Sequence, residues 1–305
     1  MSFLACLLWA GSAWALEQAD VDLRSYRWHY GTESCETDAA PPIEVLRVNP
    51  SSFILRQNKC QHFEAPFMFL LLGTERALLL DTGAIESADL FPIYATVRDL
   101  LAADHAEVNR ELVVVHSHSH LDHQKGDLQF RDKASVTLVE PNSAALEEFF
   151  NFVDWPRQTV QFDLGQRLIT VIPTPGHHAQ AISLYDPLNQ WLLTGDTLYP
   201  GSIRVKDWQA FRSSVQRLWK FSETNPVSLI LGTHIEMSRT PGEMYDIGST
   251  YQPQERALTL EVTDLKELNQ QLQRTPKAKK MIFDKFHIAP LNWLERKLSD
   301  LLSPD

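Results

Sequence analysis

A short stretch of histidines with one aspartate carries side chains that bind metal ions. His118, His120, Asp122 and His123 follow the pattern H-x-H-x-D-H, and three valines at 113–115 come shortly before them. Such an apolar run predicts a buried strand that delivers a tight loop at a fixed place. Imidazole and carboxylate groups in this register rarely arise by accident. The stretch therefore predicts a metal site.

Three further residues with metal-binding side chains stand in similar places. His177, Asp196 and His234 each lie just beyond an apolar segment and beside a turn-forming residue. Side chains at the same ends of adjacent strands converge in space although they are far apart in sequence. We therefore expect all three to join the His118 loop. Asp196, the carboxylate between the two histidines, is the candidate to bridge two cations.

Other residues near these motifs are assigned supporting or pocket-lining roles. Asp81, in Asp-Thr-Gly after an apolar run, is expected to fix the histidine loop rather than bind metal. His116 is expected at most to support a ligand, because its side chain points opposite to its strand neighbours. The candidates to line a substrate pocket are His178, Tyr199, Arg204 and Tyr245.

The elements that position these residues are predicted from hydrophobic periodicity and turn residues, and they indicate an α/β fold. Strands are expected at 43–48, 52–56, 66–72, 76–80, 112–115, 136–139, 168–172, 182–185, 191–194 and 227–231. Helices are expected at 85–103, 141–152, 207–221, 263–273 and 291–302.

Composition limits the classes of partner. The chain has 305 residues, is 44% hydrophobic and has a formal net charge of −11 without a basic cluster in the sequence. This balance disfavours nucleic acid and anionic membranes, so the expected partner is a small-molecule substrate; oligomeric state is left open. We expect one domain at 16–260 and a C-terminal helical extension at 261–305 packed on it.

The N-terminus predicts export. Residues 3–15 are an apolar run that closes with Ala-Trp-Ala, the small-x-small pattern of a signal-peptidase site, although the first basic residue is Arg24. We expect residues 1–15 to be a signal peptide and the mature protein to be periplasmic or secreted, without a stable membrane anchor. The alternative is a buried N-terminal segment.

Cleavage of the signal peptide would determine which cysteines the mature protein keeps. Removal of the signal peptide takes Cys6 away and leaves Cys35 and Cys60. Two cysteines in an exported protein usually pair, and closing this loop would stabilise the fold by about 3.5 kcal/mol. The alternative is two free buried thiols.

The motifs, taken in order, resemble those of the metallo-β-lactamase superfamily, in a branch similar to glyoxalase II. The resemblance rests on Asp81-Thr82-Gly83, the His118–His123 motif, Pro173–His177, Thr194–Thr197 and Gly232–His234. It implies a four-layer αββα sandwich with two cations at one edge.

The resemblance also implies how the ligands divide. His118, His120 and His177 would hold the first metal, and Asp122, His123 and His234 the second, with Asp196 between them. A set of imidazoles and carboxylates without thiolate suits zinc, iron or manganese, and zinc is the expected metal.

The expected chemistry is hydrolysis by a metal-bridging hydroxide. Two cations lower the pKa of a shared water from 15.7 toward about 7, which favours hydroxide by about 12 kcal/mol. This nucleophile would attack an ester, thioester or lactone while Asp122 orients it as the catalytic carboxylate. The sequence thus predicts a binuclear metal-dependent hydrolase.

Three alternatives stay open. Class B β-lactamases resemble the fold but generally carry Cys or Ser where this chain has Asp196. Persulfide dioxygenases resemble it with a single iron, so a mononuclear sulfur-oxidising enzyme is possible, and so is a non-catalytic binding module. The segment Gly195–Leu198 resembles the corresponding segment of glyoxalase II-type enzymes. In those enzymes Cys-Gly-Arg typically follows, whereas this chain has Tyr199–Ser202 there.

Overall fold

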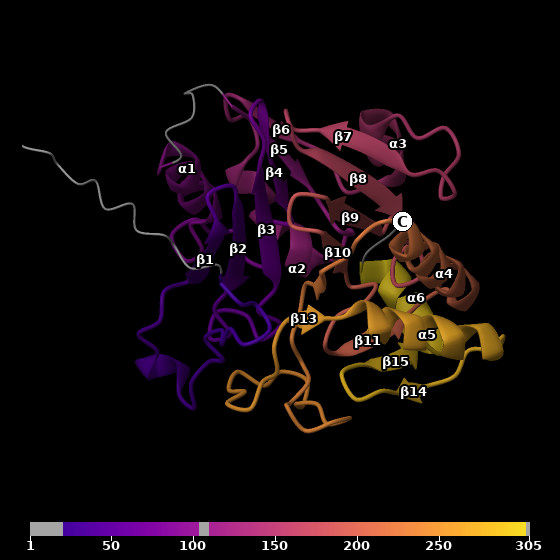
Figure 1. Ribbon diagram of the computed structural model, residues 1–305. Coiled ribbons are helices and arrows are strands. Elements are labelled where there is room, and N and C mark those ends of the chain that lie inside the picture. The colour runs from indigo at the N-terminus through magenta and orange to yellow at the C-terminus, as the bar shows by residue number, and fades with distance from the viewer. Residues whose placement is uncertain (1–20, 104–109, 303–305) are drawn as a thin grey trace, which may run out of the picture.

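The computed structural model describes residues 21–103 and 110–302, and two six-stranded sheets dominate it (Figure 1). The expected signal peptide at 1–15 lies outside the described residues. The first sheet has the order β1-β2-β3-β4-β5-β6. Its strands are β1 (Ile43–Asn49), β2 (Ser52–Gln57), β3 (Phe67–Leu72), β4 (Arg76–Leu80), β5 (Glu111–Val115) and β6 (Val136–Leu138).

The second sheet has the order β13-β12-β10-β9-β8-β7. Both sheets are mixed, because β4, β5 and β6 run parallel in the first and β10 and β12 run parallel in the second. The strands of the second sheet are β7 (Val160–Asp163), β8 (Leu168–Pro173), β9 (Ile182–Asp186), β10 (Trp191–Gly195), β12 (Leu229–Gly232) and β13 (Thr259–Leu260).

The side chains of β3 explain why the first sheet is buried on both faces. All six residues of Phe-Met-Phe-Leu-Leu-Leu are apolar and buried. Because successive side chains point to opposite faces, Phe67, Phe69 and Leu71 pack toward the second sheet. Met68 and Leu70 pack instead against Val97 of helix α1 (Ile93–Ala103). A continuous apolar strand of this kind is typical of a sheet covered on both sides.

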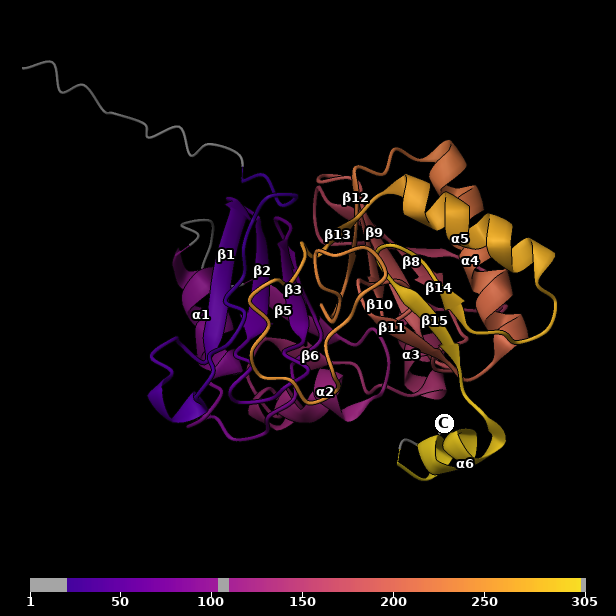
Figure 2. The same ribbon diagram turned by 90° about the horizontal axis from the view of Figure 1, so that it is seen from below.

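The outer face of the second sheet is covered by α4 (Trp208–Thr224) and α5 (Val262–Arg274). Figure 2 shows α1 outside the first sheet and α4 with α5 outside the second. The order of layers is therefore helix, sheet, sheet, helix, which confirms the expected αββα sandwich. Shorter helices are α2 (Leu121–Gln124), α3 (Ser143–Phe150), α6 (Trp293–Leu302) and the 3-10 turns η1 (Cys35–Thr37) and η2 (Lys125–Gln129).

The C-terminal segment contributes strands as well as the expected helices. Strand β15 (His287–Pro290) runs parallel to β11 (Ser202–Val205) and antiparallel to β14 (Met281–Ile282), and the three form a small sheet. Ile288 packs in one cluster with Ile203 and with apolar residues of α4 and α5. Segment 261–305 is thus joined to the domain by backbone pairing, a feature that helix periodicity alone did not predict.

Helix α1 begins later than predicted. The expected helix started at Ile85, but the structure has helix only from Ile93. Pro92 immediately precedes the helix, and the residue before a proline is disfavoured in helical backbone, so the chain stays irregular up to that point. Leu90, which falls inside the predicted helix, lies before the observed one and is 60% exposed.

Cys35 and Cys60 form a disulfide with their Cα atoms 5.2 Å apart, which confirms the expected pairing. The bond ties turn η1 to the loop after β2. Within residues 21–103 and 110–302, no helix has both the length and the apolar character needed to cross a membrane.

Candidate metal centre

The predicted ligands follow strands that end at one edge of the molecule. Strands β4 and β5 are parallel with Leu80 opposite Val115, so Asp81 and the loop from His116 leave the first sheet side by side. Strands β10 and β12 are parallel with Gly195 opposite Gly232, which brings Asp196 near His234. Helix α2, which carries Asp122 and His123, lies where both sheets end (Figure 1).

Gly195 lets the two sheets approach at this edge. A Cβ atom at this position would stand 2.6 Å from the Cβ atom of Ser117, closer than side chains pack. Its φ of +51° also lies in the left-handed region, where glycine is favoured. The glycine before Asp196 is therefore what allows this carboxylate to reach the loop of His118.

The first group of donors consists of His118, His120, His177 and Asp196. His120 Nδ1 lies 2.8 Å from His118 Nε2 and 3.0 Å from His177 Nε2. Asp196 Oδ2 lies 3.9 Å from His118 Nε2 and 3.5 Å from His177 Nε2. The structure thus brings together four ligands predicted from three separate segments.

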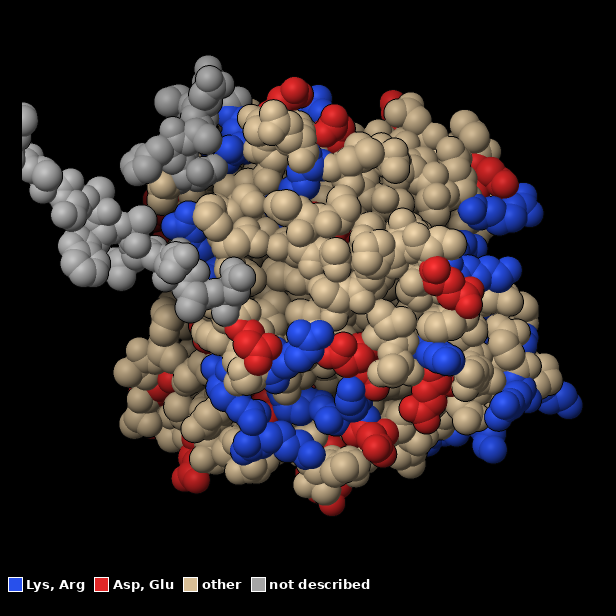
Figure 3. Space-filling model, viewed as in Figure 1, with Lys and Arg blue, Asp and Glu red and all other residues tan. Residues whose placement is uncertain are grey.

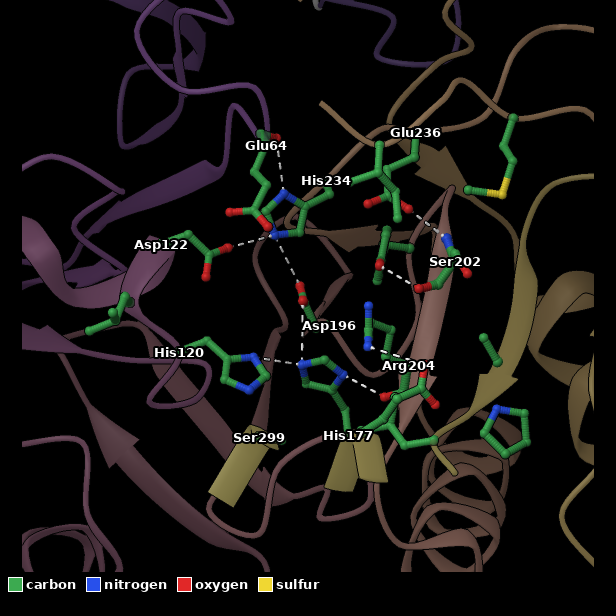
Figure 4. A pocket seen from close by; sticks show the side chains of 18 residues that line it. Glu64, His120, Asp122, His177, Asp196, Ser202, Arg204, His234, Glu236 and Ser299 are labelled. Atoms are coloured by element: carbon green, nitrogen blue, oxygen red, sulfur yellow. Dashed lines mark hydrogen bonds and ion pairs between the residues drawn. The ribbon is translucent and has the colours of Figure 1, made fainter. Parts of the chain in front are cut away.

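The second group consists of Asp122, His123 and His234. Asp122 Oδ2 lies 3.0 Å from His123 Nε2 and 3.2 Å from His234 Nε2, and the two nitrogens are 3.3 Å apart. Asp196 Oδ1 approaches the same two nitrogens at 3.8 and 3.4 Å. The two oxygens of Asp196 therefore face different groups, as a bridging carboxylate must (Figure 4).

The donor geometry fits divalent metals. Four donors about 2.0–2.1 Å from a tetrahedral zinc would be about 3.3 Å from one another. The separations from 2.8 to 3.9 Å bracket this value in both groups. Five imidazoles and two carboxylates also match the nitrogen and oxygen donors that zinc, iron and manganese accept.

Burial keeps the first-group imidazoles neutral. Desolvation lowers the pKa of His120 to about 2 and the pKa of His177 to about 3, and it holds the pKa of His118 well below its usual value. Neutral imidazole is the form that binds a metal. In the second group burial also lowers the pKa of His234, but Asp196 and Asp122 outweigh it and raise the value to about 9.

Backbone carbonyl oxygens fix two of the imidazole rings. His177 Nδ1 lies 2.7 Å from the carbonyl oxygen of Arg204, and His234 Nδ1 lies 3.1 Å from that of Glu64. Since a carbonyl can only accept, each Nδ1 carries the proton and leaves Nε2 free as a ligand.

Asp81 and His116 take supporting positions. Asp81 accepts hydrogen bonds from Ser117 N at 2.7 Å and Ser117 Oγ at 2.9 Å, and its Oδ2 lies 2.9 Å from His123 Nδ1. His116 Nε2 lies 2.8 Å from Asp127 Oδ1, the atom that also accepts the Thr82 hydroxyl. His116 therefore supports the loop through Asp127 and makes no contact there with a metal donor.

A cavity of about 610 Å³ opens over the two groups. Tyr199 and Arg204 line it, as predicted from sequence. Two other candidates do not: His178 is fully buried with its Nε2 3.2 Å from Ser119 Oγ, and the Tyr245 hydroxyl accepts the Gln254 amide. The ring of His178 packs edge-on against that of His120, with the centroids 5.1 Å apart, so His178 lies behind the donors and not in the cavity.

Sequence reasoning missed two acidic residues of the cavity wall. Glu64 and Glu236 both line it, close to His234 in Figure 4. Burial and the nearby Asp122 raise the pKa of Glu64 to about 7. Glu236 accepts the Ser202 amide at 2.7 Å. Neither follows an apolar strand directly, so the strand-end signal that found the ligands did not extend to them.

The fold and the seven donors define a metal-dependent hydrolase with a binuclear type of site. The chain belongs to the metallo-beta-lactamase superfamily, whose family model matches residues 63–234. This range contains every predicted metal ligand.

Two curated relatives and one solved structure illustrate the similarity. The acyl-coenzyme A thioesterase MBLAC2 of Gallus gallus is 26% identical over 60% of this chain and 77% of its own length. A hydroxyacylglutathione hydrolase of Brucella ovis is 33% identical over 27% of this chain and 32% of its own. The structure of TMB-1 covers 78% of this chain and 100% of its own, with 14% identity and a TM-score of 0.50, a likeness of fold alone.

Proposed function

We propose that this protein is a thioesterase that cleaves small acyl thioesters at a binuclear zinc site. The observation that carries the proposal is the composition of the cavity over the donors. Its lining includes the apolar side chains of Met244, Ile247, Pro290 and Leu291, together with the charged residues Arg204 and Glu295. An acyl chain would contact the apolar residues, and a polar leaving group would face Arg204.

The relatives support the same bond type. Both curated relatives carry names of enzymes that cleave thioesters, one of acyl-coenzyme A and one of hydroxyacylglutathione. The bridging position of Asp196, with one oxygen toward each donor group, supports two metals rather than one. A single-iron dioxygenase would need only one of these groups.

The side chains have distinct tasks in the proposed reaction. When bound, the two metals would lower the pKa of water and polarise the substrate carbonyl. Asp122 lines the cavity beside His123 and His234, where its carboxylate can accept a hydrogen bond from the attacking water and so orient it. No protein nucleophile is needed.

Elemental analysis with a substrate panel tests the proposal. The purified protein is expected to hold about two zinc ions per chain and to hydrolyse acyl thioesters faster than esters, lactones or β-lactams. His118→Ala and Asp196→Ala should lower both metal content and hydrolysis. One iron per chain with oxygen uptake would instead show a dioxygenase, and hydrolysis unchanged in both variants would refute metal catalysis.

We also propose that the protein works in an oxidising compartment, the periplasm or the extracellular space. The Cys35–Cys60 disulfide supports this, because such bonds persist mainly outside the cytosol. Expression of the full chain followed by N-terminal sequencing of the product tests it. Export predicts a mature start after Ala15; an uncleaved cytosolic product with free thiols would contradict it.

A further inference from the structure

A second cavity, distinct from the catalytic one, is lined by three arginines. It has a volume of about 190 Å³, and Arg27, Arg239 and Arg256 line it with Tyr30 and Glu255 among its other residues. It shares no lining residue with the cavity over the metal donors. Figure 3 shows many Lys and Arg side chains in the lower part of this face, with Asp and Glu among them, over the loop drawn in orange in Figure 1.

The three guanidinium groups are held by neutral acceptors. Arg27 Nη1 donates to the carbonyl oxygen of Glu255 at 3.1 Å, and Arg256 Nη1 donates to that of Asp284 at 2.7 Å. Arg239 donates to the side-chain amide oxygen of Gln254. Carbonyl oxygens position a guanidinium without cancelling its charge, and each guanidinium has five N–H groups, so donors remain for a ligand.

Within the described part of the chain, no carboxylate forms a direct ion pair with the three arginines. None of the three guanidiniums forms an ion pair within 4 Å there, although Asp264 and Asp284 act on Arg256 from farther away. The one carboxylate among the lining residues, Glu255, is held in a two-bond pair with Arg56 at 2.6 and 2.7 Å, and its side chain is only 4% exposed. Arg56 therefore already neutralises the negative charge of Glu255.

Backbone pairing fixes two of the arginines. Arg239 N donates to Gln254 O at 2.8 Å and Arg256 N donates to Met237 O at 3.2 Å, while Ser238 and Glu255 form an antiparallel bridge. Arg27 reaches the same place from the N-terminal segment. Three cations are thus held together by the fold, in a chain whose formal charge is −11. Like charges repel, and an anion bound among these arginines would be attracted by all three.

We propose that this cavity binds a compact oxyanion, a phosphate ion or the phosphate group of a small monoester. Planar guanidiniums match the geometry of phosphate oxygens and donate to them in pairs. The volume admits a phosphate group but not a whole nucleotide. Tyr30, 41% exposed at the cavity, would stand beside the remainder of an esterified ligand. The site is independent of the proposed thioesterase activity.

Isothermal titration of the metal-loaded full chain with inorganic phosphate, and separately with glycerol 3-phosphate, tests the proposal. Phosphate can also bind the metals, so variants of the cavity arginines are compared with the wild type to separate the two sites. Arg239→Gln and Arg256→Gln should each remove a binding component or weaken it by about tenfold or more, since each loses charged hydrogen bonds to the ligand. Tighter binding of glycerol 3-phosphate would identify an esterified ligand, and equal or weaker binding a free ion.

Arg157→Gln is the matched control, because Arg157 is an exposed arginine paired with Asp154 and lies outside this cavity. Arg157→Gln should leave phosphate binding unchanged both at the metals and in the arginine cavity. Thermal melts verify that the two cavity variants remain folded. If every variant binds phosphate as the wild type does, or if only the component at the metals is present, the proposal is wrong.

Discussion

Asp81 Oδ2 lies 2.9 Å from Nδ1 of His123, and both side chains are fully buried. The same carboxylate holds the amide and hydroxyl of Ser117, so one residue orients a metal ligand and the start of the loop that carries three others. Partners of metal-bound histidines typically contribute 10- to 100-fold to metal affinity. Asp81→Asn, which keeps the shape and loses the charge, should weaken metal binding by about this factor.

Competition titration with a chelating indicator measures that affinity. Asp132→Asn is the control, because Asp132 is exposed and has a φ of +56°, in the same left-handed region as the +69° of Asp81. Both substitutions therefore meet the same backbone requirement. Equal metal affinity in the two variants would show that Asp81 does not act through His123.

Gly195→Ala should damage the metal centre more than an ordinary glycine substitution. The added methyl group would meet Ser117 Cβ at 2.6 Å, in addition to the strain of a φ of +51°. At Gly242, where φ is +73°, a Cβ atom meets nothing closer than 3.6 Å, so Gly242→Ala isolates the backbone strain, worth about 1 kcal/mol. Chemical denaturation and zinc content are measured for both. A smaller loss at Gly195 than at Gly242 contradicts the close approach.

Lys59 should make stability depend on pH. Burial, followed by the nearby Arg56, lowers the pKa of Lys59 to about 7, against 10.5 for an exposed lysine. Between these values the unfolded chain binds more protons than the folded one, so the free energy of unfolding rises with pH across this window. Below pH 7 the buried charge is present in full and costs on the order of a few kcal/mol.

Lys59→Met should therefore stabilise the protein below pH 7 and abolish the rise between pH 7 and 10.5. Urea denaturation across this range measures the effect. Lys277→Met, at an exposed position, should leave the pH profile unchanged. A wild-type profile that stays flat between pH 7 and 10.5 would disprove the shifted titration of Lys59.

Loss of the Cys35–Cys60 disulfide should lower the free energy of unfolding by about 3.5 kcal/mol, the chain-entropy value for a sequence separation of 25. The double variant Cys35→Ser/Cys60→Ser tests this by denaturation. A reducing agent should destabilise the wild type to the same extent and have no effect on the variant. Metal content should not change, because neither cysteine is among the donors.

The metal ligands were predictable because their signals are local. Each follows an apolar strand and a turn, so the residue types and their order identify His118, His177 and His234 without knowledge of the sheet order. Asp196 was predicted as a bridge for the same reason. The division of donors into two groups and the four-layer fold came from the family resemblance, because a continuous apolar strand such as β3 does not reveal what covers each face.

The cavity wall was harder to predict because it depends on long-range packing. Strands β11 and β15 have four residues each and pair across more than 80 positions, so no short-range pattern marks them. Glu64 belongs to the loop before β3 and reaches the cavity only through the sheet arrangement. His178 follows His177 directly in the sequence, and only the packing of the loop shows that His177 lines the cavity while His178 is buried.

The pairing of β11 with β15 makes the cavity depend on a part of the chain that holds no metal donor. Arg204 on β11 contributes the carbonyl that orients His177, while Ala289, Pro290 and Leu291 at the end of β15 form part of the cavity wall. A change in length between α5 and β14 would move this wall and leave each ligand in place. The shape of the cavity can therefore change without any change in the donors below it.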